Sequence, residues 1–373
     1  MIIDSVSLRN FKCFADEVFP LSKLNVLTGV NGVGKSTLIQ SILLAAQAPA
    51  LSKLEFNGAL VEIGDYSDLH HSNALDDSSC ISIRSANGDF RWGFEEGTKF
   101  DQQKYPTSLP QMDGEQNEKD WLGSNFVYLS AERWGPRDYV PLNTQHANPY
   151  WLGKHGEFSI AFLNSLANSS LKDNDGKSLA TTSEDDPRIH SDNIGVVMLS
   201  NIIAWMGEIS PNVNINTDVI KEAAIGYSTF DFGSGSKFRA INVGFGLSYA
   251  LSIVTALVSA REGSIVLLEN PEAHLHPSGQ SKLGQLLALT AAAGVQVIVE
   301  THSEHIINGA RIKVRKAEVQ PDLVRIMYIS RDDEKLASTV EILDLDKMGH
   351  VSNWPSGFFD QQAIDMKTLI TGR

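Results

Sequence analysis

The sequence predicts an α/β fold that contains an antiparallel β portion and an inserted, mainly helical subdomain. First, a glycine-rich stretch at 29–37 lies between an apolar strand-like run, 24–28, and a segment of good helix formers, 38–46. Second, a continuous apolar run, 264–268, and a further buried strand, 295–299, are each followed by a glutamate and have the character of buried parallel strands. Both observations indicate parallel strands joined through helices.

The antiparallel portion is expected in the first third of the chain. Residues 2–8 have the spacing of a half-buried strand, and the runs 80–83 and 90–94 alternate as in an antiparallel meander. The polar stretch 99–120 is expected to be a loop. A further strand is expected at 126–129.

The middle of the chain is expected to hold the inserted subdomain. Apolar spacing predicts helices at 158–167 and 194–206, and the polar stretch 169–192 between them is expected to be a mobile surface insertion. We divide the chain into three predicted parts: an N-terminal lobe, 1–130; the insertion, 131–235; and a C-terminal lobe, 236–373.

In the C-terminal lobe, the apolar run 249–260 predicts a helix, and a second helix is expected from about Ser278 to 293. Strands are expected at 324–329 and 340–345.

Composition narrows the class of protein. A hydrophobic content of 42% in 373 residues is enough for a sizeable core. The two cysteines, Cys13 and Cys80, are too few for a disulfide framework or a thiolate zinc site, which favours a reducing cytoplasm. The first residues lack a secretory signal pattern, and no apolar run is long enough to span a bilayer. We therefore expect a cytoplasmic protein that does not enter a membrane.

The charge of the chain argues against general binding to nucleic acids. Its formal net charge is −14, whereas binding to a polyanion depends on clustered lysine and arginine. A local basic groove remains compatible with this net charge.

The glycine-rich stretch has the pattern G-x-x-x-x-G-K-[ST] between a strand and a helix, which is typical of a phosphate-binding loop. Its glycines allow backbone N–H groups to turn toward phosphates, and the helix N-terminus adds a positive dipole end. Lys35 is expected to reach the β- and γ-phosphates, and Ser36 to bind Mg²⁺. The expected binding residues are Asn31, Gly32, Val33, Gly34, Lys35, Ser36 and Thr37.

Acidic residues follow the first buried C-terminal strand. Glu269, at its carboxyl end, is where a P-loop enzyme holds Mg²⁺ through water. A neighbouring strand ends in Glu300 and is followed by His302, which is placed to sense a γ-phosphate. We interpret His274 and His276 as loop-packing or interface residues.

A second anion-binding helix start is expected before 249–260. Gly244, Gly246 and Ser248 precede that helix, although glycine and serine at a helix start are weak evidence taken alone.

Other charged residues leave alternatives open. Arg133 and Arg137 bracket a Gly-Pro turn and suit either a charged ligand or subunit contact, or a structural pair with Glu132 or Asp138. Arg9 and Lys12 suit phosphate or solvent equally well. The adjacent histidines His70 and His71 lack the spacing and further ligands of a zinc site.

With these elements in this order, the chain resembles ABC-type ATPases of the RecF, SMC and overcoming-lysogenization-defect class, and most closely the stand-alone AAA-type ATPases of bacterial anti-phage systems. In this resemblance 29–37 corresponds to Walker A, 243–248 to the signature loop and 265–270 to Walker B. Residues 273–276 correspond to the D-loop, and 301–302 to the switch histidine. The stretches 130–137 and 354–360 also look like these relatives, and 58–69 is the candidate Q-loop region.

The resemblance implies an ATPase with ATP and Mg²⁺ as cofactors. Two heads sandwich two ATP molecules head to tail, with Gly244 and Gly246 of one subunit capping the γ-phosphate bound by the other. ATP then forms part of the interface, which implies a homodimer or a higher even-numbered oligomer.

The chain departs from the family at the end of Walker B. The family has Asp followed by Glu, whereas this chain has Glu269 followed by Asn270. Glu269 can still hold Mg²⁺, but the amide of Asn270 cannot act as a general base. Glu272 is the nearest substitute, so we expect slow turnover and a persistent ATP-bound dimer.

The sequence leaves two main hypotheses of function. The first is an ATP-gated regulator of a separate effector, such as a nuclease in phage defence, because the chain has a nucleotide site and no second catalytic constellation. The second is a RecF-like clamp that closes on DNA with ATP, which a basic stripe of Arg9, Lys12 and Arg133 would favour. A degenerate scaffold without turnover is a third alternative.

Overall fold

The computed structural model describes residues 2–48, 52–86, 88–98, 107–113, 126–143, 148, 150–169, 180–193, 195–355 and 357–372. The chain divides into two compact units. Unit 1 comprises Met1–Trp121 and Val324–Arg373, and unit 2 comprises Leu122–Leu323. The three-part division at 130 and 235 stays a prediction.

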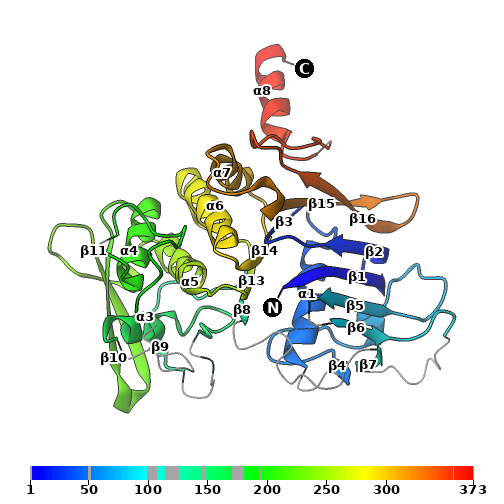
Figure 1. Cartoon of the computed structure of the whole chain (residues 1–373), viewed down its shortest axis with the longest axis horizontal. Helices are drawn as coiled ribbons and strands as arrows, with labels where there is room; N and C mark the ends of the chain where they lie inside the picture. The colour runs from blue at the N-terminus through cyan, green and yellow to red at the C-terminus, as the bar shows by residue number, and fades with distance from the viewer. Residues whose placement is uncertain are drawn as a thin grey trace. The chain divides into compact units, whose positions relative to one another are not determined.

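The antiparallel sheet of unit 1 has the order β2-β1-β5-β6-β7-β4. Figure 1 shows β2, β1, β5 and β6 in this sequence. Its strands are β1 (Ile3–Phe11), β2 (Phe14–Pro20), β4 (Lys53–Glu55), β5 (Cys80–Ser85), β6 (Gly88–Gly93) and β7 (Ser108–Asp113). The prediction of a loop throughout 99–120 was wrong, because Leu109 is fully buried in β7 and pairs with Leu54. The rest of that stretch lies outside the described residues.

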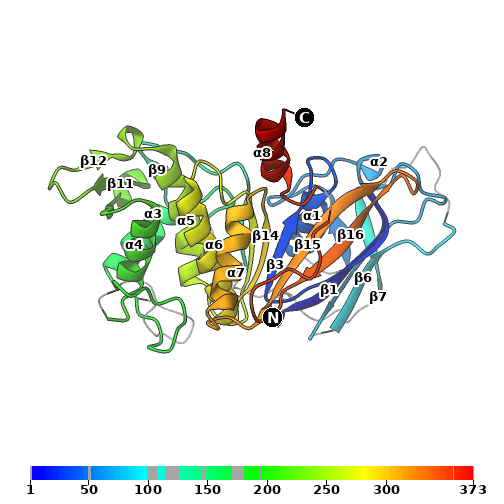
Figure 2. The same ribbon diagram turned by 90° about the horizontal axis from the view of Figure 1, so that it is seen from above.

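A second group of strands in unit 1 leads into the glycine-rich loop. β3 (Leu24–Thr28) pairs in parallel with β15 (Val324–Asp332), which pairs antiparallel with β16 (Ala337–Asp344). All five residues of β3 are buried. The helix α1 (Lys35–Gln47) follows the loop, as the sequence predicts (Figure 2).

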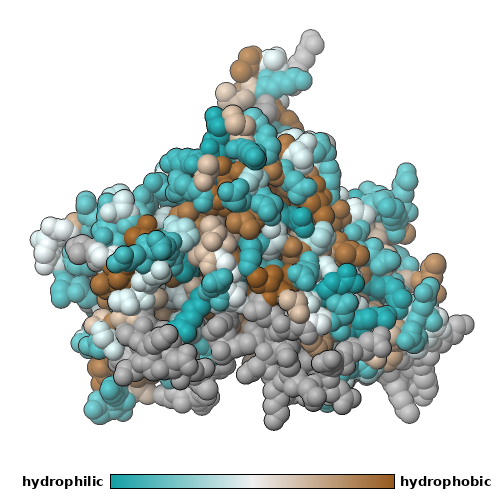
Figure 3. Space-filling model, viewed as in Figure 1, coloured by the Kyte–Doolittle hydropathy of each residue, from teal (hydrophilic) through white to brown (hydrophobic). Residues whose placement is uncertain are grey.

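Two other helices belong to unit 1. The short α2 (Tyr66–Leu69) is capped by Asp65, and α8 (Gln361–Thr371) lies at the C-terminal end. No helix was expected at 361–371. The apolar side chains of Ile364, Met366, Leu369 and Ile370 are exposed on α8, which is visible at the top of Figure 3.

Unit 2 contains a parallel group of strands in the order β14-β13-β8, covered by helices. Its strands are β8 (Phe126–Leu129), β13 (Ile265–Glu269) and β14 (Gln296–Glu300). The helices α5 (Phe245–Ser259), α6 (Pro277–Ala292) and α7 (Glu304–Arg315) lie side by side in both ribbon views. Apart from Gln296 and the terminal Glu269 and Glu300, the residues of β13 and β14 are apolar and buried, as in strands covered on both faces.

The remainder of unit 2 combines an antiparallel sheet with two helices. β11 (Ile225–Asp231) pairs with β10 (Asn214–Ile220), β12 (Phe238–Arg239) and β9 (Val140–Pro141). The helices are α3 (Ser159–Ala167) and α4 (Met198–Ile209), close to the predicted positions.

The polar stretch 169–192 differs from its prediction as a mobile surface insertion. Part of it, 170–179, lies outside the described residues. Within the described part, Arg188 is only 6% exposed and donates to the carbonyls of Leu257 and Ala260, 2.8 and 2.6 Å away. A buried arginine that binds the end of α5 anchors this segment. The sequence could not show that anchor, since a polar composition does not say which side chains turn inward.

None of the helices in the described part of the chain has the length and apolar character needed to cross a membrane.

Candidate nucleotide-binding site

The glycine-rich loop of unit 1 has a backbone that other residues cannot easily adopt. Gly29 has φ 144°, and a Cβ there would lie 2.1 Å from the carbonyl oxygen of Ile329. Gly34 has φ 101°, and a Cβ would lie 2.0 Å from Cys13 Sγ. Both positions therefore require glycine, for conformation and for space.

The lysine of the loop turns back over it. Lys35 is 4% exposed, and its Nζ donates hydrogen bonds to the carbonyl oxygens of Gly29 (3.1 Å) and Val30 (2.8 Å). Gly34 precedes α1 without a side-chain cap, and the first turn of α1 holds no acidic residue. The helix thus presents its N-terminal N–H groups without a competing carboxylate, as an anion site requires.

The other expected binding residues of the loop differ in exposure. Asn31 and Gly32 are exposed, Ser36 is half-buried, and Val33 and Thr37 are buried. Val33 and Thr37 pack around Cys13, whose Sγ lies 3.5 Å from the Val33 carbonyl and 3.7 Å from Thr37 Oγ1. Burial raises the pKa of the Cys13 thiol, so it stays protonated beside the loop.

In unit 2, the carboxylate of Glu269 is held at the end of β13 by two donors. Tyr128 Oη donates to Oε1 over 3.1 Å, and the backbone N–H of Ala131 donates to Oε2 over 3.0 Å. Burial of the Tyr128 phenol, with Glu269 beside it, raises the pKa of Tyr128. Tyr128 therefore remains a hydrogen-bond donor to Glu269 at neutral pH.

A buried arginine braces the same strand end. Arg133 is 3% exposed, and its guanidinium donates to the carbonyl oxygens of Ser130 (2.7 Å), Glu269 (2.6 Å) and Asn270 (2.6 Å). It also lies over the ring of Tyr249 in α5, 5.3 Å from the centroid. Desolvation lowers the pKa of Arg133 to about 10, so the side chain is still charged at neutral pH.

Neither alternative that the sequence left open for Arg133 describes this geometry. The side chain binds backbone carbonyls, not a carboxylate partner, and it is too buried for a surface contact. The sequence shows an arginine shortly after a buried strand, but it does not show which carbonyl groups this arginine binds.

Asn270 follows Glu269 in a left-handed conformation, with φ 44°. Its N–H donates to the carbonyl of Glu300 over 2.8 Å, while its buried Oδ1 has no hydrogen-bond partner among the described residues. Asparagine adopts this left-handed backbone more readily than most residues other than glycine.

Glu272 is joined to the segment that carries His302. Its Oε2 accepts from Thr301 Oγ1 (2.8 Å), and its Oε1 accepts from the backbone N–H of His302 (2.7 Å). Thr301 is fully buried, whereas His302 is exposed. Within unit 2 the structure thus brings together Glu269, Asn270, Glu272 and His302.

The expected signature residues lie at the start of α5. Gly244 is the residue before the helix, is exposed and has no atom within 4 Å of a built Cβ. At Gly246 a Cβ would lie 2.6 Å from the carbonyl oxygen of His274. Ser248 instead lines a pocket on another side of α5. His274 packs against the ring of Tyr249, with centroids 4.9 Å apart, and His276 caps α6.

The remaining candidates have structural partners. His70 and His71 contact Ser79 Oγ and the Lys12 carbonyl, respectively. Arg9 donates to the carbonyl of Phe94, and Lys12 Nζ donates to Gln40.

A glycine loop between a buried strand and a helix, with parallel strands that end in carboxylates, defines a P-loop head of the ATPase type. The chain belongs to the family described as "AAA domain, putative AbiEii toxin, Type IV TA system", which matches residues 24–308. A second family, "Protein of unknown function (DUF3696)", matches residues 319–369. No curated protein matches the sequence.

Solved structures of SMC heads share this fold. One is an SMC head bound to the C-terminal winged-helix domain of ScpA, with TM-score 0.54 and 13% identity over 93% of this chain and 99% of that one. Another is an SMC head with an extended coiled coil bound to the C-terminal domain of ScpA, from Pyrococcus furiosus, with TM-score 0.53 and 13% identity over 99% of both chains. The chain is therefore an AAA-family protein whose fold is that of the SMC heads.

Proposed function

We propose that this protein binds ATP with Mg²⁺, hydrolyses it slowly and dimerises around it to regulate a separate effector protein. The observation that carries slow turnover is the environment of the Walker B end. The position after Glu269 is an amide, and both carboxylate oxygens of Glu272 accept hydrogen bonds. Among the described residues at this strand end, no side chain is thus held free to take a proton from the attacking water.

The loop of unit 1 fits a bound triphosphate. Glycine is required at Gly29 and Gly34, and the start of α1 has no acidic residue. In the proposed site, Lys35 exchanges its loop carbonyls for phosphate oxygens, and the 31–37 segment supplies backbone N–H groups. Ser36 and Glu269 are the proposed Mg²⁺ ligands; the bound ion would neutralise charge on the phosphates.

Other residues of unit 2 support this chemistry. Arg133 and Tyr128 hold Glu269 in place. The hydrogen bond that Glu272 accepts from the backbone N–H of His302 orients this residue, the proposed γ-phosphate sensor. Gly244 and Gly246 are the proposed contacts to ATP held by the second copy. A dimer closed in this way persists as long as ATP does.

The regulatory role rests on the family and on the fold. Two SMC heads of the same fold are bound to domains of a separate protein, ScpA. We propose that this head likewise engages a separate protein, with a nuclease in anti-phage defence as the specific candidate. A DNA clamp is disfavoured, because Arg133, one of the three residues of the basic stripe it would use, is 3% exposed.

Phosphate release and molecular mass, measured together, test this function. The native chain should form a dimer in ATP and Mg²⁺ and release phosphate slowly, whereas the Lys35→Ala chain should stay monomeric. Omission of Mg²⁺ should abolish release. Failure of the native chain to bind ATP in excess Mg²⁺ would overturn the proposal.

A further inference from the structure

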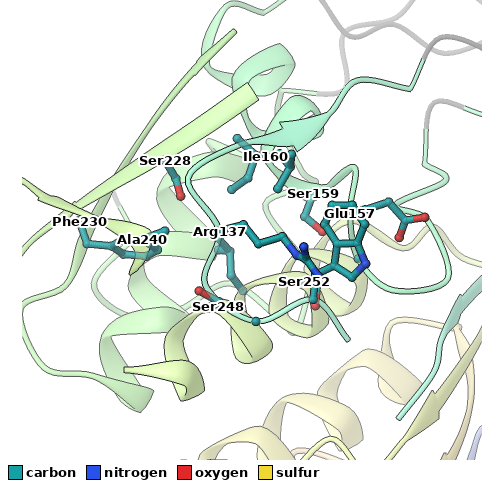
Figure 4. Close-up of a pocket in the computed structure, with 14 residues that line it drawn as sticks. Arg137, Glu157, Ser159, Ile160, Ser228, Phe230, Ala240, Ser248 and Ser252 are labelled. Carbon is teal, nitrogen blue, oxygen red and sulfur yellow. The ribbon is translucent and has the colours of Figure 1, made fainter. Parts of the chain in front are cut away.

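A pocket in unit 2, lined by both polar and apolar residues, is not used by the site described above. It is small and partly open to solvent. Its walls come from the 134–140 segment, the start of α3, β11 and one face of α5 (Figure 4).

One wall carries a buried hydroxyl without a partner. Ser159 is 3% exposed, lines the pocket, and its Oγ has no hydrogen-bond partner among the described residues. Buried polar atoms are rarely left in this state, so the atom points to a missing partner. Ser159 is also the first residue of α3, whose first turn has no acidic residue and no side-chain cap. The positive end of the α3 dipole therefore lies at the pocket.

An arginine supplies a positive charge to the pocket. Arg137 lines the pocket and stacks on Trp134, with its guanidinium carbon 4.1 Å from the ring centroid. It makes no ion pair or hydrogen bond with another residue in the described ranges. The one acidic lining residue, Glu157, accepts from the N–H of His155 over 2.9 Å and points away from Arg137 in Figure 4. The guanidinium thus remains available to an anion.

The opposite wall belongs to α5. Ser248 and Ser252 lie one turn apart on this helix and line the pocket, and Ser252 Oγ donates to the Tyr249 carbonyl over 3.1 Å. Ser248 makes no such bond within the described part of the chain. A planar guanidinium, two hydroxyls and a helix N-terminus provide more donors than a two-oxygen carboxylate needs, and they suit the three free oxygens of a phosphate.

We propose that this pocket binds a phosphate group, either as the free ion or as the monoester of a small molecule. Arg137 and the hydroxyls of Ser159 and Ser248 are its ligands. The bound group would contact Ser248 and therefore α5, the helix that begins after Gly244. Occupancy of the pocket would thereby influence the signature loop.

Fluorescence titration of Trp134 in the full-length Lys35→Ala chain tests the proposal, since that background weakens phosphate binding at the glycine-rich loop. Inorganic phosphate and ribose 5-phosphate are the two probes. A saturable change in emission is expected, which Trp134→Phe should remove. Tighter binding of ribose 5-phosphate identifies a monoester site, and equal or tighter binding of the ion identifies a phosphate site.

Added to the same background, Arg137→Ala and Ser159→Ala should each raise Kd about tenfold or more, as expected for loss of a bond to a charged group. Arg331→Ala, which removes an arginine 59% exposed in unit 1, is the charge-matched control and should leave Kd unchanged. Ser159→Ala removes a single oxygen, so its fold should be preserved, and unfolding midpoints check this. Absence of saturation with both probes, or an unchanged Kd in both pocket variants, would overturn the proposal.

Discussion

The backbone N–H of His302 donates a 2.7 Å hydrogen bond to the carboxylate of Glu272. The other carboxylate oxygen accepts from Thr301, so a single side chain holds the segment after β14 by two bonds. In this arrangement Glu272 supports the position of His302. Its proposed role as a substitute base requires these bonds to be released or shared with water.

Glu272 and Thr301 should be energetically coupled. Glu272→Ala leaves the O–H of the buried Thr301 without its acceptor, although Oγ1 still accepts from the N–H of Ser303, and should lower the free energy of unfolding by about 1–3 kcal/mol. Thr301→Val removes the same bond from the other side. In urea unfolding, the double variant should therefore lose less stability than the sum of the single variants, by about 0.5 kcal/mol or more. Strict additivity would show that the bond makes no contribution.

Arg133 should matter more for stability than any exposed arginine. Arg133→Ala removes the guanidinium donors to the carbonyls of Ser130, Glu269 and Asn270, of which the last keeps the N–H of Ala273, and should reduce the free energy of unfolding by about 3 kcal/mol. Arg133→Lys should recover part of this loss, because one ammonium can reach some of the same oxygens. Arg331→Ala, at an exposed position, should change stability by less than about 0.5 kcal/mol. Equal effects of Arg133→Ala and Arg331→Ala would contradict the bracing role.

Alanine substitutions at Gly244 and Gly246 should differ in effect, one on dimerisation and the other on stability. Gly246→Ala places a Cβ 2.6 Å from the His274 carbonyl and should destabilise the fold by about 1–3 kcal/mol. Gly244→Ala meets no atom within 4 Å and should leave the unfolding midpoint close to that of the native chain. If Gly244 contacts ATP bound by the second copy, its variant should nonetheless weaken ATP-dependent dimerisation in sedimentation experiments. Normal dimerisation of Gly244→Ala would remove it from the proposed interface.

The hydrogen bonds to Asp76 should make the stability of the fold depend on pH. Hydrogen bonds from Ser78, from both its hydroxyl and its N–H, and from the N–H of Gly97 lower the pKa of Asp76. Because the pKa of Asp76 is lower in the folded chain, its carboxylate stabilises the fold fully at pH values above the ordinary pKa of 3.8. This stabilisation is lost as pH falls through the pKa of Asp76 in the folded chain. The stability difference between the native chain and Asp76→Asn should therefore be larger at about pH 6 than at about pH 3. A constant difference across this range would contradict the assignment.

Local sequence patterns predicted the helices and strands near the site. The elements that they missed form through contacts between residues far apart in the sequence. The strand 24–28, the loop and α1 follow from an apolar run, glycine spacing and helix formers, and β13 and β14 follow from mainly apolar runs. In contrast, β7 forms because Leu109 is buried opposite Leu54, and α8 has no distinctive signal before it.

The same division holds within the site. Residue types identified Lys35, Glu269 and His302 as candidates, since each type has one chemical task in such motifs. The support of Glu269 by Tyr128 joins residues 141 positions apart, and that of Glu272 by Thr301 joins residues 29 apart. Contacts of this kind depend on which strand ends meet, which a single sequence does not specify.

The protein is proposed to keep ATP bound for long periods and to hydrolyse it slowly, because an amide occupies the position after Glu269. Steady-state release of phosphate from ATP by the native chain and by Asn270→Glu tests this claim most directly. A carboxylate at 270 restores a general base, so kcat should rise by about tenfold or more, while the ATP-bound dimer should become shorter-lived. Rapid turnover in the native chain that neither Asn270→Glu nor Glu272→Gln alters would contradict the account.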